Sequence, residues 1–247
     1  MLYLVGNGPS RKDFDLNQLD QWWGMNMIYR DYQPELVFIH DIAPQNEMVK
    51  DKYYKNHKVC TGEWNELPME MWEVMQYGLP GKEIIQTRAP DDDRFVVQGE
   101  GPIGKDRTYM VGYTIAHSNN IVIYKNDLLR NLFCGMYALA YAVHHGHKQI
   151  CLFGYDALQY DELQNIYGPE DCDTYHEVYT EVQGVGTVQK AQFVALLEHI
   201  NTDYPDVEIF FKNSIDGFDK VEYNDILSRY NIEDKWILDK GCLESEI

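Results

Sequence analysis

The sequence predicts an α/β protein in which a mostly parallel sheet is layered with helices on both faces. Three short apolar stretches within the first 41 positions read as strands, and each ends at or contains a polar residue. A second block, residues 129–156, combines an apolar helix, a glycine, a buried strand and a Gly-x-Asp ending. The length of 247 residues suits one domain with a substantial core, so we expect a single domain over 1–247.

The opening stretch, from Leu2 to Ser10, joins an apolar strand to the turn Gly-Asn-Gly-Pro-Ser. In a parallel sheet, the loop after the carboxyl end of the first strand is where a nucleotide usually lies. A bulky residue in place of Gly6 or Gly8 would hold a phosphate or ribose away from the backbone. The turn matches neither the dinucleotide fingerprint nor a Walker A loop, and a plain strand-to-helix turn is the alternative interpretation.

The remaining elements are expected in chain order. The first half predicts a helix over 11–23 capped by Asp13 or Asp15, strands over 25–29 and 36–39, short strands at 58–60 and 83–85, a helix over 69–76 and an exposed loop over 89–105. The second half predicts a helix over 129–145 that ends at Gly146 in the left-handed conformation, a strand over 149–153, a helix over 187–200, a strand over 207–211 and a helix over 223–230.

Residues 158–186 lack apolar periodicity and are rich in tyrosine, acidic residues and glycine. Polar segments of this length inside a compact domain are usually functional or mobile. We interpret the segment as a lid over a ligand, and a disordered excursion is the alternative.

Composition narrows the classes of partner. The net charge of −19 disfavours nucleic-acid binding and adhesion to anionic membranes. A free nucleotide is less affected, because a local cradle of backbone amides can outweigh the global field. The five cysteines form no C-x-x-C pair, no signal-peptide pattern is visible at residues 1–6, and no window approaches the length of a membrane span. These features predict a protein of the cytoplasm without a membrane span.

Several short motifs occur in one order along most of the chain. They are Asn-Gly-Pro-Ser at 7–10, a strand with Asn26, a strand ending Val-Phe-Ile-His at 37–40, Cys-Gly-Met-Tyr at 134–137, the Gly-x-Lys to Gly-x-Asp run at 146–156 and Asn-Ser at 213–214. In this order they resemble the bacterial family 42 sialyltransferases. They are also similar to the related DUF115 proteins, which include a 6-hydroxymethylpterin diphosphokinase.

The resemblance implies a single Rossmann-like domain, GT-A-like, with a lid at 158–186. It implies a nucleotide and donor site formed by Asn7, Gly8, Pro9, Ser10, Asn26, Cys134, Gly135, Asp156, Asn213 and Ser214. Tyr160 and Tyr167 would stabilise the leaving phosphate without a metal. The histidine that serves as general base in the family is missing near 184–186, so His176 or His40 would deprotonate the acceptor hydroxyl.

Three functions therefore stay open. The first is transfer of a sugar from a CMP-activated or other nucleotide-activated donor to a small or glycan acceptor, with no cofactor required. The second, implied by the diphosphokinase-like proteins, is Mg²⁺-dependent pyrophosphoryl transfer with Asp41 and Asp156 as metal ligands. The third is a nucleotide-binding protein without catalysis, which the missing histidine favours.

Overall fold

The structure is a computed structural model that describes residues 1–40, 44, 47–48, 51–62, 85–88, 95–100, 108–113, 121–124, 132–159, 166–167, 185–212 and 217–230. The chain divides into two compact units. The first comprises Met1–Phe38 and Lys125–Ile247, and the second comprises Ile39–Tyr124. The second unit is thus inserted in the chain of the first.

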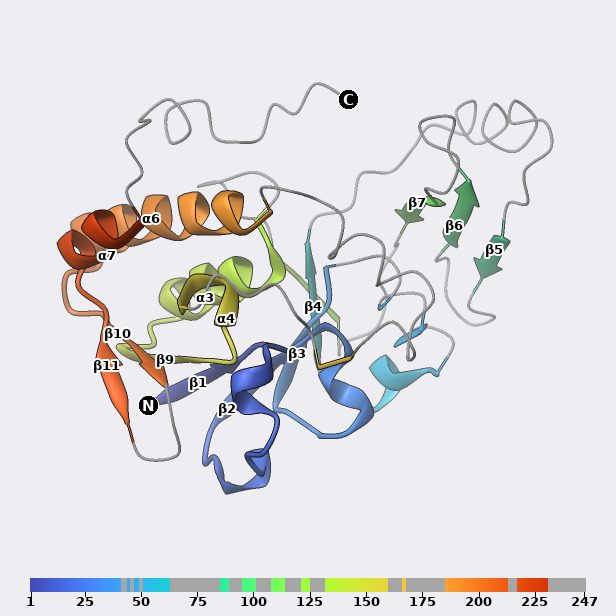
Figure 1. The fold of residues 1–247 in the computed structure, drawn as a ribbon. Coiled ribbons are helices and arrows are strands. Elements are labelled where there is room, and N and C mark those ends of the chain that lie inside the picture. The colour runs from blue at the N-terminus through green and yellow to red at the C-terminus, as the bar shows by residue number, and fades with distance from the viewer. Residues whose placement is uncertain are drawn as a thin grey trace. The chain divides into compact units, whose positions relative to one another are not determined.

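A mostly parallel sheet forms the centre of the first unit, as predicted (Figure 1). Its strands are β1 (Leu2–Val5), β2 (Trp22–Met25), β3 (Leu36–Phe38), β9 (Gln149–Phe153), β10 (Glu208–Lys212) and β11 (Phe218–Lys220). They lie in the order β11-β10-β9-β1-β2-β3, and only β11 is antiparallel to its neighbour. The central strands carry few polar residues because both faces of such a sheet are covered.

The α-helices of the first unit stack together. They are α3 (Cys134–His144), α4 (Asp156–Gln159), α6 (Val185–Asp203) and α7 (Tyr223–Tyr230). Helix α3 packs on β1 and β3, and α6 packs in turn on α3, α4 and α7 (Figure 1). Small residues let α3 approach the sheet closely, and Ala138, Ala140 and Ala142 are almost fully buried. Within the described residues, no helix has the length and apolar character needed to cross a membrane.

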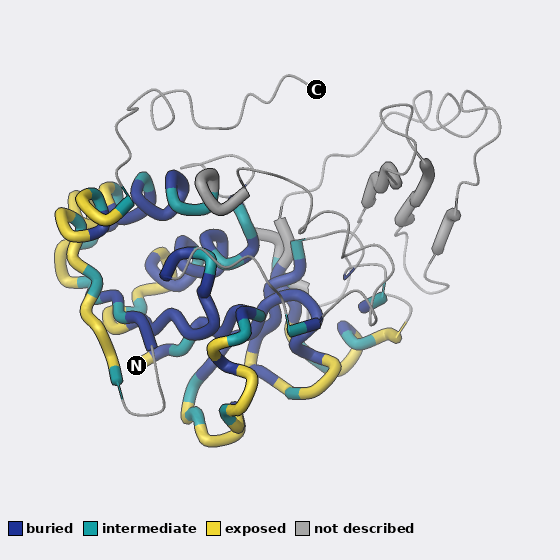
Figure 2. Tube along the Cα trace, in the orientation of Figure 1, coloured by how far each residue is buried: buried dark blue, intermediate teal, exposed yellow. Residues whose placement is uncertain are grey.

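The other face of the sheet is covered by 3₁₀ turns instead of the predicted helix over 11–23. These turns are η1 (Pro9–Arg11), η2 (Leu16–Gln18) and η3 (Asn26–Arg30). Val5 and Phe153 pack there against Leu16, Met27 and Ile28 in one buried cluster. Figure 2 shows that β1, β9 and α3 are buried almost throughout, so the core lies on both sides of the central strands. The helices expected on both faces are therefore found as α-helices on one face, and the described residues on the other face form 3₁₀ turns.

The predicted strand over 25–29 is wrong by several residues. The strand occupies Trp22–Met25, and Asn26 follows it with a positive φ of 47°. This left-handed conformation ends the strand, and asparagine tolerates it better than most residues. Trp22 and Trp23 extend the strand backwards because each packs against aromatic residues, Tyr32 for Trp22 and Phe38 for Trp23. The predicted cap Asp15 does cap a turn, since its carboxylate accepts the N–H of Asn17 in η2.

The second unit contains two groups of strands. Strand β4 (Val59–Gly62) pairs in parallel with β8 (Ile121–Tyr124), and β5 (Ile85–Arg88), β6 (Phe95–Glu100) and β7 (Thr108–Tyr113) form an antiparallel sheet. The predicted exposed loop over 89–105 is therefore wrong where β6 lies. Its Phe-Val-Val run is a strand signal that the surrounding aspartates and glycines obscured. The predicted helix over 69–76 lies outside the described residues.

The later elements follow the sequence prediction closely. Strand β9 and helix α7 have the predicted bounds, whereas β10 is displaced by one residue, and α6 is longer than the predicted helix. Helix α3 begins only at Cys134 and ends at His144, one residue before the predicted end, and Gly146 follows in the predicted left-handed conformation with a φ of +82°. The N–H groups of Gly146 and His147 donate to Val143 and Ala142, which is the Schellman arrangement.

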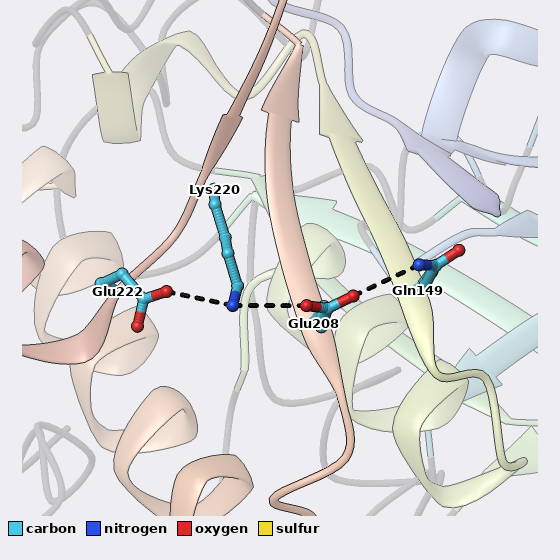
Figure 3. Close-up of polar contacts among 4 residues, drawn as sticks. All are labelled: Gln149, Glu208, Lys220 and Glu222. Atoms are coloured by element: carbon cyan, nitrogen blue, oxygen red, sulfur yellow. Dashed lines mark hydrogen bonds and ion pairs between the residues drawn. The ribbon is translucent and has the colours of Figure 1, made fainter.

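Exposed polar contacts join the edge strand β11 to the rest of the sheet. Lys220 lies between Glu208 and Glu222, with N–O distances of 3.3 and 3.2 Å (Figure 3). Gln149 donates to the same Glu208 at 3.2 Å. Hydrogen bonding lowers the pKa of Glu208 and raises that of Lys220. Because all these side chains face water, the contacts contribute little to the stability of the fold.

Candidate functional site

Strands β1 and β9 are neighbours, yet the chain leaves them toward opposite edges of the sheet. Strand β1 leads to β2 on one side, whereas β9 leads to β10 on the other. Such a reversal of strand order is the topological switch point where open parallel sheets usually bind ligands, outside the carboxyl ends of the strands. The turn after β1, residues 6–10, and the turn after β9, residues 154–156, meet at this point.

Glycines bring the backbones of the two turns into direct contact. Gly6 donates to the carbonyl of Phe153 at 2.7 Å, and Gly8 donates to that of Gly154 at 2.9 Å. A Cβ on Gly8 would lie 1.9 Å from Oδ2 of Asp156, and one on Gly6 would lie 2.5 Å from the carbonyl oxygen of Gly154. The close approach of the β9 turn is therefore an internal reason for glycine at both positions, and contact with a ligand stays a prediction.

The carboxylate of Asp156 joins the two turns. Oδ1 accepts the backbone N–H of Ser10 at 2.9 Å, and Oδ2 accepts its hydroxyl at 2.8 Å. Only 3% of Asp156 is exposed. Because Ser10 is in the first turn of η1, the carboxylate caps that turn from 146 residues away in the chain. Two of the predicted donor-binding residues are thus in contact with each other.

Asn7 connects the β1 turn to its surroundings through both its side chain and its backbone. Its Nδ2 donates to the carbonyl of Met25 at 3.0 Å, and its Oδ1 accepts from Arg11 at 3.0 Å. Its carbonyl accepts the N–H of Ile166 at 2.9 Å. Residues 166–167, which belong to the predicted lid, therefore dock on the β1 turn.

Sequence reasoning did not identify Arg11 as a site residue. In the structure only 2% of Arg11 is exposed. Its Nε donates to the carbonyl of Gly6 at 2.6 Å, and its Nη2 also approaches the hydroxyl of Tyr167 at 3.4 Å. Its guanidinium lies over the Tyr167 ring, 5.7 Å from the centroid. The only sequence signal was a cation immediately after the Asn-Gly-Pro-Ser turn, at the first position of the helix predicted over 11–23.

Lys212 is a second buried cation. It is the last residue of β10 and pairs with Phe153, the last residue of β9. Its ammonium lies 5.2, 5.6 and 4.9 Å from the ring centroids of Phe14, Phe153 and Phe218. These aromatic faces stabilise the buried charge through cation–π attraction. The carboxyl edge of the sheet thus carries two buried positive charges in a strongly acidic protein.

The N-terminus of α3 lies at the same edge of the sheet. The thiol of Cys134 donates to the carbonyl of Phe38 at the end of β3, at 3.1 Å. The hydroxyl of Tyr155 donates to the carbonyl of Gly135, also at 3.1 Å. The side chain of its N-cap residue, Phe133, makes no capping hydrogen bond, and the backbone N–H of Phe133 donates to Oε1 of Gln192 at 3.0 Å. Asn26, another predicted donor-binding residue, is buried directly after β2.

The structure describes two of the four predicted catalytic residues. Burial lowers the pKa of His40, in the second unit, to about 4, so this imidazole is neutral near pH 7. Burial raises the pKa of Tyr167 to about 12, against the opposing effect of Arg11, while a hydrogen bond with Asp31 adds to the rise. The other predicted site residues lie outside the described residues: Tyr160, His176, Asn213, Ser214 and the alternative metal ligand Asp41.

Fewer backbone N–H groups of the β1 turn are available to a ligand than the sequence indicates. The N–H groups of Gly6, Gly8 and Ser10 are each used inside the protein, and proline has none. Among the described residues, none accepts a hydrogen bond from the N–H of Asn7. An anion bound here would therefore depend on Arg11 and on the N-terminus of α3 more than on the turn itself.

A magnesium ion at Asp156 would compete with Ser10 for the same carboxylate oxygens. In the part of the chain that the structure describes, no group of three or more His, Cys, Asp and Glu residues is arranged to hold a metal. The second predicted ligand, Asp41, lies outside the described residues, so magnesium at this edge stays a prediction and we assign no step of a reaction to it.

Comparisons with protein-family models, with curated proteins and with solved structures gave no match to this chain. What the geometry establishes is an α/β protein whose two strand-end turns are joined at the switch point of a mostly parallel sheet.

Proposed function

We propose that the chain binds a nucleotide-activated sugar at the carboxyl ends of β1 and β9 and transfers the sugar to an acceptor hydroxyl. The observation that supports this is the switch point, where the β1 and β9 turns, the buried Arg11 and the N-terminus of α3 occur together. Rossmann-like sheets bind nucleotides at this point, with phosphates near a helix N-terminus. A Rossmann-like domain of the GT-A kind is part of the same proposal.

The proposed reaction forms a bond between the acceptor oxygen and the anomeric carbon of the sugar. A base removes the acceptor proton, and the nucleotide leaves with the electron pair of the broken C–O bond. A general base works best when its pKa is near the working pH. His40, with a pKa of about 4, binds a proton too weakly, so we assign the base to His176 and assistance of the leaving phosphate to Tyr160.

Thermal denaturation tests the binding step. The full chain is melted with CMP, CDP, UDP, GDP and ATP, each with and without Mg²⁺. A nucleotide at about 100 times its dissociation constant adds roughly 2.7 kcal/mol to the free energy of unfolding, which a melting curve resolves. The proposal expects stabilisation by CMP or another free nucleotide without metal. No shift with any nucleotide would overturn it, and a shift only with ATP and Mg²⁺ would favour pyrophosphoryl transfer.

The reaction step needs its own variant. We expect His176→Ala to bind nucleotide like the wild type and to release none from an activated-sugar donor, because only the base is lost. His145→Ala is the matched control, since His145 is exposed at the end of α3, where its ring bonds to and stacks on Tyr141. Donor turnover by His176→Ala at the wild-type rate would remove the assignment, and binding without turnover by the wild type would favour a non-catalytic nucleotide-binding protein.

A further inference from the structure

Arg11 combines deep burial with contacts to neutral groups. The described residues surround its guanidinium with the carbonyl of Gly6, the amide oxygen of Asn7 and the hydroxyl and ring of Tyr167. The carboxylate of Asp31 lies beyond the Tyr167 hydroxyl, to which it hydrogen-bonds, and among the described residues no carboxylate forms an ion pair with Arg11 directly. A buried cation whose direct partners are all neutral is costly, even when its N–H groups are hydrogen-bonded. An anionic ligand group near Arg11 would reduce that cost, whereas a neutral ligand would not.

Arg11 also fixes the orientation of the Asn7 amide. Because Nη2 of Arg11 can only donate, the atom of Asn7 that faces it must be the carbonyl oxygen Oδ1. The amide nitrogen is then directed to the carbonyl of Met25, which uses one of its two N–H groups. Within the described part of the chain, the second N–H of the amide and the backbone N–H of Asn7 donate to no acceptor.

The same guanidinium also contacts residues 166–167, which dock on the β1 turn. Its Nη2 approaches the hydroxyl of Tyr167, and the N–H of Ile166 donates to the carbonyl of Asn7. Arg11 therefore contacts both the β1 turn and Tyr167, which lies 156 positions later in the chain. A single side chain positions these two parts of the site. Removal of Arg11 would leave the Asn7 amide free to rotate and Tyr167 without its cation.

We propose that Arg11 is the positioning residue of the switch-point site, and that it selects ligands carrying a phosphate over the corresponding nucleosides. It does so by holding Asn7 as a hydrogen-bond donor and by supplying a buried positive charge under the β1 turn. The inference rests on the proposed nucleotide site and names the chemical group that the site recognises. In a low-dielectric surrounding such a charge acts over several ångströms without direct contact.

The test compares CMP with cytidine by isothermal titration calorimetry on the full chain, with circular dichroism to establish folding. We expect Arg11→Met to weaken CMP binding by about tenfold or more and cytidine binding by less than about threefold. Lys12→Met is the matched control, because it removes the same charge one residue away from an exposed side chain. It should change neither affinity by more than about threefold.

Equal loss of CMP and cytidine affinity in Arg11→Met would overturn the inference, because a purely structural role affects both ligands alike. If Arg11→Met does not fold, Arg11→Lys is measured instead, since it keeps the charge and loses the planar fork. We then expect a smaller loss confined to CMP, and equal losses would again overturn the inference. Failure of the wild type to bind CMP would refute the proposed nucleotide site, whereas wild-type binding that Arg11→Met leaves unchanged would refute only the role of Arg11.

Discussion

The variant Gly8→Ala tests why position 8 is a glycine. The close contact with the β9 turn or contact with a ligand could each require it. Gly8 has φ −69° and ψ 153°, which alanine adopts without strain, so any cost comes from the added methyl group. That Cβ would lie 1.9 Å from Oδ2 of Asp156 and 2.7 Å from the carbonyl oxygen of Gly154. The carbonyl belongs to backbone that is itself bonded to Gly8, so the Asp156 carboxylate has to move away from Ser10.

The cost follows from the hydrogen bonds that move with the carboxylate. Hydrogen bonds to a charged group contribute about 1.5–3 kcal/mol each, and partial rehydration offsets some of that, so we expect a loss of about 3 kcal/mol. For a chain of this size that is roughly 6–12 °C in Tm. Gly146→Ala is the matched control, because a Cβ there meets nothing within 4 Å and only its φ of +82° is unfavourable. It should cost about 1–2 kcal/mol.

Thermal and urea denaturation of both variants, with and without CMP, measure the difference. The double variant Gly8→Ala with Asp156→Ala should be less destabilised than the two single variants added together, because the second change removes the atom with which the first collides. If Gly8→Ala costs no more than Gly146→Ala, the contact between the turns is not what requires glycine. Unchanged stability with lost CMP binding would instead show that the ligand requires it.

Three further outcomes can be measured on the same equipment. The pKa of His40 is about 4 in the folded protein and near 6.5 in the unfolded chain, so the unfolded chain binds the proton first as the pH falls. The free energy of unfolding should therefore decrease by about 2 kcal/mol between neutral pH and pH 5 because of this group. His40→Gln should remove that part of the pH dependence. A pH profile identical to that of the wild type would contradict this. Ser10→Ala removes the hydroxyl contact of the Asp156 carboxylate and keeps the N–H contact, so denaturation should show a loss of about 1–2 kcal/mol, and no loss would mean that water replaces the hydroxyl without cost. Lys220→Met removes only exposed ion pairs and should leave the urea midpoint unchanged, and a clear decrease would mean that the β11 edge depends on them.

Local signals were sufficient for much of the fold. Strand β9 was predicted because an apolar run stands between two glycines, and α3 was predicted to end at Gly146 because glycine adopts the left-handed conformation. Each of these signals lies within a few residues of the element that it defines. The same local reasoning failed at Asn26, where a single left-handed residue divides an apolar stretch into a strand and a 3₁₀ turn.

The contacts of the candidate site are not local, and this is why the sequence could not predict which of its residues bond to one another. The partner of Ser10 is 146 residues away, and the hydroxyl that Arg11 approaches is 156 residues away. From sequence, an arginine after a turn reads as a surface residue, because surface is where most arginines lie. Residues 166–167 dock on the β1 turn and place Tyr167 against the Arg11 guanidinium. Composition and spacing carry no information about that contact.

The charge of the protein makes the position of Arg11 more informative. A chain with a net charge of −19 repels a nucleotide at long range, so a site for one needs a local positive potential. The N–H groups of the β1 turn contribute little of it, since Gly6, Gly8 and Ser10 use theirs within the protein. A buried guanidinium is screened by salt far less than a surface charge is. Nucleotide binding that depends on Arg11 should therefore persist at ionic strengths that abolish attraction by exposed lysines.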